Sequence, residues 1–223
     1  MAYANLSVIR PSTALRRVGL FVDVQNIYHS VQNSLGRQCK IDYKALMEFA
    51  RWRGFLRVAK MFKAYNPEQQ NEVNFFVAMH HIGYEVIREP LKSYMGEEGE
   101  KRGDLDALIG YHIGLEAQNL DEIILVSGDG DFATVVKHLR YAGKHVTVIG
   151  VRNCTNNNLI IESSEFVSAL DVPGFIRREG SSSEIMLTDQ AGFPDSSTSN
   201  GFDNCSTRGN HVEKNFAEIN HRS

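Results

Sequence analysis

Two carboxylates directly follow an apolar segment in the stretch Ile123–Phe132, whose sequence is I-I-L-V-S-G-D-G-D-F. Asp129 and Asp131 would stand at the end of a buried strand, where like charges about 5 Å apart repel by roughly 3 kcal/mol at an effective dielectric constant near 20. A divalent cation removes that penalty, and carboxylate oxygens are the ligands that Mg²⁺ and Mn²⁺ prefer. Asp23 lies near the end of a second apolar segment, Val18–Val24, which indicates one site shared by two strands.

The two apolar segments belong to a pattern in which strands alternate with amphipathic helices. The expected strands are 18–24, 56–65, 84–88, 122–127 and 145–151, and the expected helices are 26–35, 43–53, one from Pro67, 104–118, 132–142 and a short one at Leu159. This alternation implies right-handed crossovers and a sheet covered on both faces. We therefore predict an α/β fold of three αβα layers with a mostly parallel central sheet of about five strands. In such sheets ligands bind beyond the carboxyl ends of the strands.

The alternating pattern also predicts the faces of the helices. The spacing of apolar residues favours a buried face made of Val73, Phe76, Val77 and His80 in the helix that follows Pro67. For the helix over 104–118 it favours one made of Leu105, Leu108, Ile109, His112 and Leu115. Asp42 is in the N-cap position of the helix over 43–53.

Domain boundaries follow from the limits of this pattern. We expect a lead-in over residues 1–17, one domain over 18–178 and a disordered polar tail over 179–223. From residue 180 onward the chain has six acids and three bases, so the preceding part has 21 of each and is formally neutral. Binding to nucleic acid would therefore need a local basic patch. One candidate is a stripe formed by Arg51, Arg53, Arg57, Lys60 and Lys63. The alternative is that these residues form an ordinary solvated surface without an RNA-binding role.

The cysteines and the hydropathy predict the compartment. Cys39, Cys154 and Cys205 are odd in number and widely spaced, so neither a disulfide framework nor a zinc site is indicated. No apolar run approaches membrane-spanning length, and Asp23 interrupts the first one, which argues against a signal peptide. We expect a cytoplasmic protein with no membrane association.

Four polar segments are expected to meet at the carboxyl edge of the sheet. They are Asp23-Val-Gln-Asn26, Lys101–Asp106, Ser127–Phe132 and Asn153–Asn158. Their order and spacing resemble the NYN domain, a PIN-like nuclease fold, and within it the bacterial LabA-like group. The D-x-x-N after the first strand and the S-G-D-G-D-F after the fourth are the most specific parts of this resemblance, which covers about residues 16–172.

The resemblance implies a metal-dependent ribonuclease that hydrolyses phosphodiester bonds of single-stranded or structured RNA, with Mg²⁺ or Mn²⁺ as cofactor. The implied metal ligands are Asp23, Asp106, Asp129 and Asp131, and Asn26 would join them as a catalytic residue that orients water or a ligand. RNA contacts are expected at Lys101, Arg102, Arg152 and Asn156. The chain departs from the pattern at His112, where many relatives carry an acid six residues after the counterpart of Asp106. We interpret His112 as a satisfied core histidine.

Several of these residues have a structural alternative. Asp23, Asp104 and Asp131 could be helix caps, Asn26 an ordinary helix-start residue, and Asp106 an acid favoured by the helix dipole alone. For Asp104 the cap is the preferred interpretation.

Two other functions compete with the nuclease. The domain could be a catalytically weak or inactive RNA- or protein-binding regulator. A haloacid-dehalogenase-like phosphatase would need a second acid two residues after Asp23, where Gln25 stands, and is disfavoured. The sequence leaves open a homo-oligomer and a protein partner bound through residues 179–223.

Overall fold

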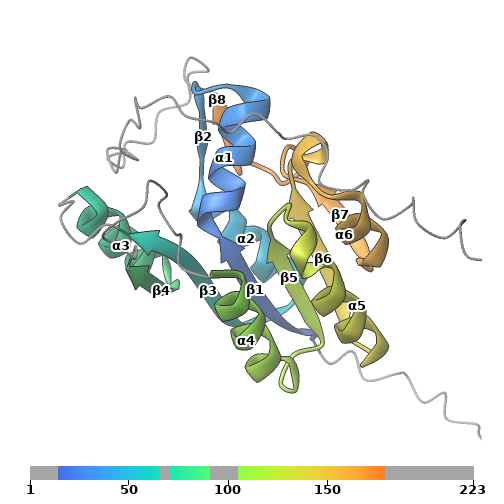
Figure 1. Cartoon of the computed structure of the whole chain (residues 1–223). Coiled ribbons are helices and arrows are strands. Elements are labelled where there is room, and N and C mark those ends of the chain that lie inside the picture. The colour runs from blue at the N-terminus through green and yellow to red at the C-terminus, as the bar shows by residue number, and fades with distance from the viewer. Residues whose placement is uncertain (1–14, 66–70, 91–104, 179–223) are drawn as a thin grey trace, which may run out of the picture.

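A central parallel sheet dominates the computed structural model of this chain, which describes residues 15–65, 71–90 and 105–178. The sheet has six strands in the order β4-β3-β1-β5-β6-β7 (Figure 1). These strands are β1 (Arg17–Asp23), β3 (Phe55–Tyr65), β4 (Glu85–Pro90), β5 (Glu122–Val126), β6 (His145–Gly150) and β7 (Glu165–Ser168). All of their pairings are parallel. A separate antiparallel pair consists of β2 (Cys39–Ile41) and β8 (Ile176–Arg178).

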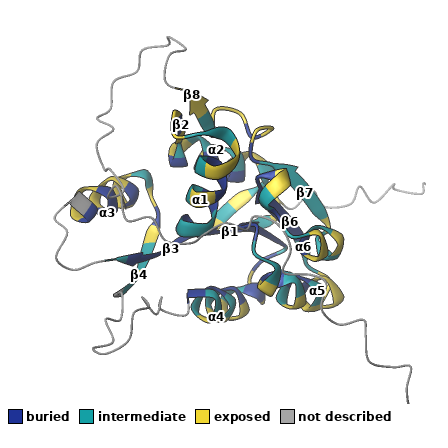
Figure 2. Ribbon diagram, turned by 45° about the horizontal axis from the view of Figure 1, so that its top comes forward, coloured by how far each residue is buried: buried dark blue, intermediate teal, exposed yellow. Residues whose placement is uncertain are grey.

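Helices cover both faces of the central sheet, which confirms the predicted three-layer αβα fold. The helices are α1 (Val24–Leu35), α2 (Tyr43–Arg53), α3 (Asn71–Ile82), α4 (Leu105–Ala117), α5 (Ala133–Tyr141) and α6 (Asn157–Glu162), with two 3-10 turns, η1 (Gly130–Phe132) and η2 (Arg152–Cys154). α1, α2 and α3 pack on one face, and α4, α5 and α6 pack on the other (Figure 2).

The apolar residues of the strands alternate between these two layers. In β1, Val18, Leu20 and Val22 are buried under α1, α2 and α3, whereas Phe21 is buried under α4. β5 repeats this arrangement, with Ile124 on the first face and Ile123 on the second. A strand covered on both faces reads as a continuous apolar run, which is why these strands are recognisable in the sequence.

Three short strands, β2, β7 and β8, were not predicted from the sequence. β7 has four residues, all of them only partly buried, and β2 and β8 have three residues each. Such segments are too short to show an alternating pattern over several residues. The expected number of about five strands is therefore one too low for the central sheet.

The predicted buried face of α3 is wrong in three of its four residues. Glu72, Phe75, Phe76 and Met79 are buried, whereas Val73 and Val77 are 47% and 50% exposed and His80 is exposed. Lys63 Nζ on β3 donates to Glu72 Oε1 at 2.6 Å, and both partners of this ion pair are buried. In α4 the buried line is Leu105, Ile109, Ile113 and Ala117, and Leu115 is 54% exposed.

Asp42 caps α2 as predicted, and its Oδ1 accepts from the backbone nitrogens of Lys44 and Ala45 at 2.9 and 3.1 Å. β1 starts at Arg17, the last residue of the expected lead-in over 1–17. The predicted helix start at Pro67, the helix cap at Asp104 and the disordered tail over 179–223 lie outside the described residues. Among the described helices, none is both long and apolar enough to cross a membrane.

Candidate functional site

Asp23 is the last residue of β1 and the N-cap of α1. Its Oδ1 accepts a hydrogen bond from the backbone nitrogen of Asn26 at 3.0 Å. Asp23 therefore caps α1, as its structural alternative predicted. Asp23 is only 5% exposed. A cap by itself does not require burial of the carboxylate, because exposed Asp and Ser residues satisfy helix N-termini equally well.

Asp129 and Asp131 lie on the loop that follows β5. Asp129 is the N-cap of η1 and accepts from the backbone nitrogen of Asp131 at 3.0 Å. Asp131 is exposed, and α5 has no side-chain cap, so the alternative of Asp131 as a helix cap is wrong. The side chain of Asp131 thus remains available on the surface.

Asp106, in the first turn of α4, completes an acidic group with these two residues. Carboxylate oxygens of Asp106, Asp129 and Asp131 all lie within 4.8 Å of one another. Asp23 lies close enough for its charge to interact with Asp106 and Asp129. The structure therefore brings together the four acids that were predicted as metal ligands, three in one compact group and the fourth buried beside it.

The ionisation of Asp23 reflects this crowding. Burial raises the pKa of Asp23 to about 6, repulsion from Asp106 and Asp129 adds to the rise, and the hydrogen bonds from Asn26 and Ser127 oppose it. A carboxyl group with this pKa binds a proton more readily than an ordinary aspartate. A nearby cation would favour the ionised form, so the site is electrostatically suited to a divalent ion.

Asn26 and Ser127 connect the two strand ends. Asn26 Oδ1 accepts from the backbone nitrogen of Gly128 at 2.7 Å. Ser127 Oγ donates to Asp23 Oδ2 at 3.4 Å and accepts from the backbone nitrogen of Asp129 at 3.2 Å. Ser127 belongs to the S-G-D-G-D-F motif, although no role was predicted for it. The position of Ser127 between an apolar strand and the first acid is the sequence feature that could have indicated its role at the site.

The segment 151–156 closes over the Gly-rich loop. A Cβ atom at Gly128 would lie 2.5 Å from the carbonyl oxygen of Cys154, and one at Gly130 would lie 2.5 Å from the Asn156 amide nitrogen. The backbone nitrogen of Asn156 also donates to the Gly128 carbonyl at 2.9 Å. Both positions favour glycine because the segment 151–156 packs too closely for a Cβ atom. This packing holds the loop that carries Asp129 and Asp131.

The predicted RNA-binding residues have different locations. Asn156 caps α6 by accepting from the Asn158 backbone nitrogen at 2.8 Å. Arg152 is exposed, with its guanidinium carbon 5.3 Å from the centre of the Phe166 ring. Lys101 and Arg102 lie outside the described residues. Of the two predicted RNA-binding residues that the structure describes, Asn156 contacts the loop that bears the acids.

The predicted basic stripe is largely neutralised. Arg53 pairs with Glu122 and Glu165, Lys60 pairs with Glu85 and Glu116, and Lys63 pairs with Glu72. Lys60 and Lys63 are 7% and 5% exposed. These three cations are structural, and the stripe does not exist as a continuous charged surface.

His112 is only partly the satisfied core histidine that was predicted. Its ring packs on Phe62 with centroids 5.5 Å apart, but among the described residues its buried Nδ1 has no hydrogen-bond partner. Burial lowers the pKa of His112, and the neighbouring charge of Lys60 lowers it further. The ring is thus predominantly neutral at pH 7.

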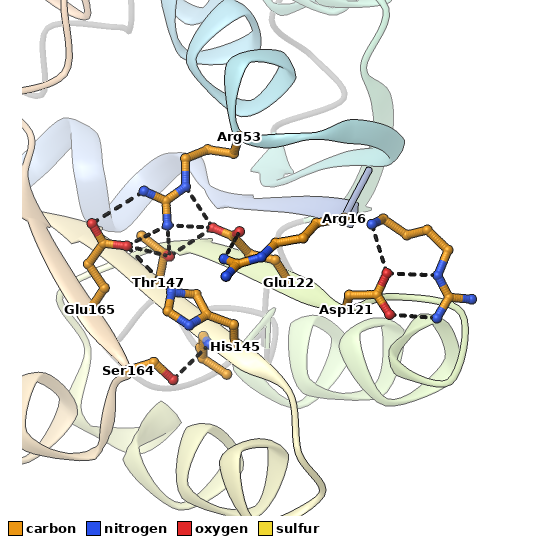
Figure 3. Close-up of polar contacts among 10 residues, drawn as sticks. Arg16, Arg53, Asp121, Glu122, His145, Thr147, Ser164 and Glu165 are labelled. Carbon is orange, nitrogen blue, oxygen red and sulfur yellow. Dashed lines mark hydrogen bonds and ion pairs between the residues drawn. The ribbon is translucent and has the colours of Figure 1, made fainter. Parts of the chain in front are cut away.

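A second group of potential ligands lies at the opposite, amino edge of the sheet. Figure 3 shows Glu122, His145 and Glu165 around the guanidinium group of Arg53. Arg53 Nε donates to Glu122 at 2.8 Å, and Arg53 also pairs with Glu165. This arginine already supplies the compensating positive charge, so this group is an ion-pair network rather than a vacant acidic site.

The fold and the acidic carboxyl edge together define an α/β domain of the PIN-like type. A sequence model of the NYN domain matches residues 17–173. The chain therefore belongs to the NYN domain family, a group within the PIN-like nuclease superfamily.

Two relatives extend this assignment. The chain is 24% identical over 174 residues to the low amplitude and bright protein LabA of Synechococcus elongatus, covering 76% of this chain and 90% of LabA. It also resembles the crystal structure of a protein of unknown function from Vibrio parahaemolyticus, with a TM-score of 0.63 and 28% identity, covering 71% of this chain and 96% of that one. Both similarities extend over most of the described residues.

Proposed function

We propose that this chain is a metal-dependent ribonuclease that hydrolyses RNA phosphodiester bonds at the carboxyl edge of its sheet. The observation that carries the proposal is the convergence of Asp106, Asp129 and Asp131 within 4.8 Å, beside the buried Asp23. The family is the second support, because NYN domains generally are ribonucleases. The LabA relative is too distant to add a substrate.

The residues present fit a hard divalent cation such as Mg²⁺ or Mn²⁺. All four acids offer oxygen donors, the kind these ions prefer, and their mutual repulsion disappears when a cation is bound. Asp23, Asp106, Asp129 and Asp131 would hold the ion. When bound, it would polarise a phosphoryl oxygen and lower the pKa of a coordinated water molecule.

The remaining groups hold the acids in position. Asn26 ties the loop after β5 to the start of α1, and Ser127 links Asp23 to the backbone of Asp129. Exposed Asp131 would face the substrate side, and buried Asp23 would form the floor of the site. Such fixed positions reduce the reorganisation needed when charge develops on the phosphate.

Cleavage of a labelled RNA of mixed sequence tests this proposal, measured with Mn²⁺, with Mg²⁺ and with chelator. We expect Asp129→Asn to reduce the metal-dependent rate by at least about 100-fold, the order seen when one preorganised charge-stabilising group is lost. Asn retains the cap that holds Asp131, so the variant should remain folded. Asp171→Asn, an exposed acid outside the site, is the matched control.

Equal cleavage by Asp129→Asn and wild type would end the assignment to the acidic site. Metal binding without cleavage in either protein would instead favour the regulatory RNA- or protein-binding module. Isothermal titration with Mn²⁺ separates these outcomes, because it measures occupancy of the site without turnover.

A further inference from the structure

Tyr43 has a buried hydroxyl group that makes no hydrogen bond. The residue is only 6% exposed, and among the described residues its Oη has no hydrogen-bond partner. An unsatisfied buried hydroxyl is costly, and phenylalanine would fill almost the same space without that cost. The neighbouring Tyr84 shows the usual arrangement, because its buried hydroxyl donates to the Tyr43 carbonyl at 2.8 Å. Packing alone therefore does not account for a tyrosine at position 43.

The course of α2 places Tyr43 toward the carboxyl edge of the central sheet. Arg53, the last residue of this helix, pairs with Glu122 at the amino edge. A helix of 11 residues spans about 16 Å. Tyr43, its first residue, therefore lies toward the opposite edge, where the acids meet.

Tyr43 is close to Asp23 in this region. Val22 and Val24, the two neighbours of Asp23 in the chain, belong to the same buried cluster as Tyr43. Burial raises the pKa of the Tyr43 hydroxyl, and the nearby charge of Asp23 raises this pKa further. The hydroxyl therefore keeps its proton at neutral pH and can donate it in a hydrogen bond.

The Asp23 carboxylate can accept a further hydrogen bond. Its Oδ1 accepts from the backbone nitrogen of Asn26 at 3.0 Å, whereas the bond from Ser127 Oγ to Oδ2 is 3.4 Å long. Hydroxyl donors usually lie about 2.5 to 3.0 Å from their acceptors, and an ionised carboxylate has about four acceptor positions. A bound divalent cation would ionise Asp23, and a closer donor would then stabilise the carboxylate.

The ring of Tyr43 is held by helices that carry none of the proposed metal ligands. It packs edge to face on Phe75 of α3, with ring centroids 5.9 Å apart. Asp42 caps α2 directly before it. A hydrogen-bond donor fixed in this way would orient the carboxylate that it contacts.

We propose that Tyr43 is a positioning residue of the acidic site, whose hydroxyl donates to the Asp23 carboxylate, directly or through one water molecule, when a divalent cation is bound. This role rests on the proposed function, which supplies the cation. Hydrogen bonds to ligating carboxylates fix their orientation, and loss of such a bond lowers metal affinity about 10- to 100-fold. Tyr43 would thus improve Asp23 as a ligand without touching the ion or the substrate.

Isothermal titration of the full chain with Mn²⁺ tests this role by comparing wild type with Tyr43→Phe. The variant keeps the ring in the core and loses only the hydroxyl. We expect its Mn²⁺ affinity to fall about 10-fold. In chelator, its urea midpoint of unfolding should equal or exceed that of wild type, because an unpartnered buried hydroxyl does not stabilise the fold. A purely structural hydroxyl would give the reverse, a lower midpoint with unchanged affinity.

Two further variants provide the controls. Tyr84→Phe also removes a buried tyrosine hydroxyl, but one that donates to a backbone carbonyl. It should lower the urea midpoint and leave Mn²⁺ affinity nearly unchanged. Asp23→Asn should weaken Mn²⁺ binding by itself, and adding Tyr43→Phe should weaken it further by less than about 2-fold, because the tyrosine acts through Asp23. Far-UV circular dichroism verifies that each variant is folded.

Three results would overturn the role of Tyr43. They are equal Mn²⁺ affinities of Tyr43→Phe and wild type, equal losses of affinity in Tyr43→Phe and Tyr84→Phe, and an undiminished effect of Tyr43→Phe in the Asp23→Asn background. If Asp23→Asn still weakens Mn²⁺ binding in these cases, the proposed metal site stands. If wild type binds no Mn²⁺, the proposed function loses its metal site and the role of Tyr43 fails with it.

Discussion

The amide oxygen of Asn26 accepts a hydrogen bond from the backbone nitrogen of Gly128 at 2.7 Å, although the two residues are 102 positions apart. This bond joins the start of α1 to the loop after β5. Asp23 lies three residues before Asn26, and Asp129 directly follows Gly128. Together with Ser127, which contacts both Asp23 and the backbone of Asp129, this amide links acids that follow two different strands.

Asn26→Ala removes this link and should lower metal-dependent cleavage by about 100-fold, because small displacements of reacting groups have effects of that size. The free energy of unfolding should fall by only about 1 kcal/mol, the net value of a typical hydrogen bond. Cleavage kinetics and urea denaturation of the same preparation provide the two measurements. A loss of stability large enough to unfold the protein would show that Asn26 supports the fold rather than the site.

Gly128→Ala places a Cβ 2.5 Å from a backbone oxygen of Cys154, so the loop must shift. We expect a destabilisation of about 1 to 3 kcal/mol, as in overpacked cores, together with loss of cleavage. Gly114→Ala is the control, because a Cβ there has no neighbouring atom within 4 Å. In the interior of α4 alanine should raise stability by about 0.5 to 1 kcal/mol. Thermal denaturation measures both effects. A shift of the melting temperature in the same direction for both variants would contradict this prediction.

Asp23 should make stability depend on pH. Its pKa rises from 3.8 to about 6 on folding, so the folded state binds more protons between these two values. Stability is therefore greatest below about pH 4 as far as this group is concerned, and it declines as pH rises toward 6, by about 3 kcal/mol in total. Above that range the metal-free protein has an ionised, buried Asp23 held among like charges.

Asp23→Asn removes this dependence because the amide does not titrate and can still cap α1. In chelator the variant should gain stability relative to wild type as pH rises from 4 to 7. Mn²⁺ at pH 7 should stabilise wild type more than the variant. Urea denaturation at several pH values, with and without Mn²⁺, measures both effects. A difference between the two proteins that stays constant with pH would show that Asp23 titrates normally.

The sequence was sufficient to predict the layers, the parallel sheet and the edge where the acids meet. β1 and β5 are apolar on both faces, so their runs stand out, and the acids at or just after their last residues, Asp23, Asp129 and Asp131, fall at the carboxyl edge. β7 could not be found because its four residues are only partly buried. Short strands of this kind are specified by their neighbours rather than by their own pattern.

Ion pairs between different elements explain why the expected basic stripe is not a charged surface. The buried side of α3 includes Glu72, which pairs with Lys63 on β3, and the cations of the expected basic stripe pair with carboxylates on other elements. Arg53 meets Glu122 and Glu165, which are 69 and 112 positions away. Neither the periodicity of apolar residues nor the number of charged residues predicts which charged side chains pair in the fold.

Arg53 and Glu122 form a buried ion pair at the amino edge of the sheet (Figure 3). Their side chains are 15% and 0% exposed, and Arg16 and Thr147 also contact Glu122 at 3.2 and 3.0 Å. Arg53→Met leaves the buried Glu122 carboxylate with fewer compensating partners. We expect a loss of about 3 to 5 kcal/mol, the usual result of removing one member of a buried pair.

Adding Glu122→Gln to Arg53→Met should recover part of that loss, because the buried charge is then gone. Lys137→Met disrupts the more exposed pair with Glu162, whose atoms are 3.5 Å apart, and should cost less than about 1 kcal/mol. Urea denaturation of the single and double variants gives the coupling energy directly. RNA cleavage by the double variant should match wild type under conditions where both are folded, because this network lies at the edge opposite the acids. A selective loss of cleavage in the folded double variant would mean that the two edges of the sheet are energetically coupled.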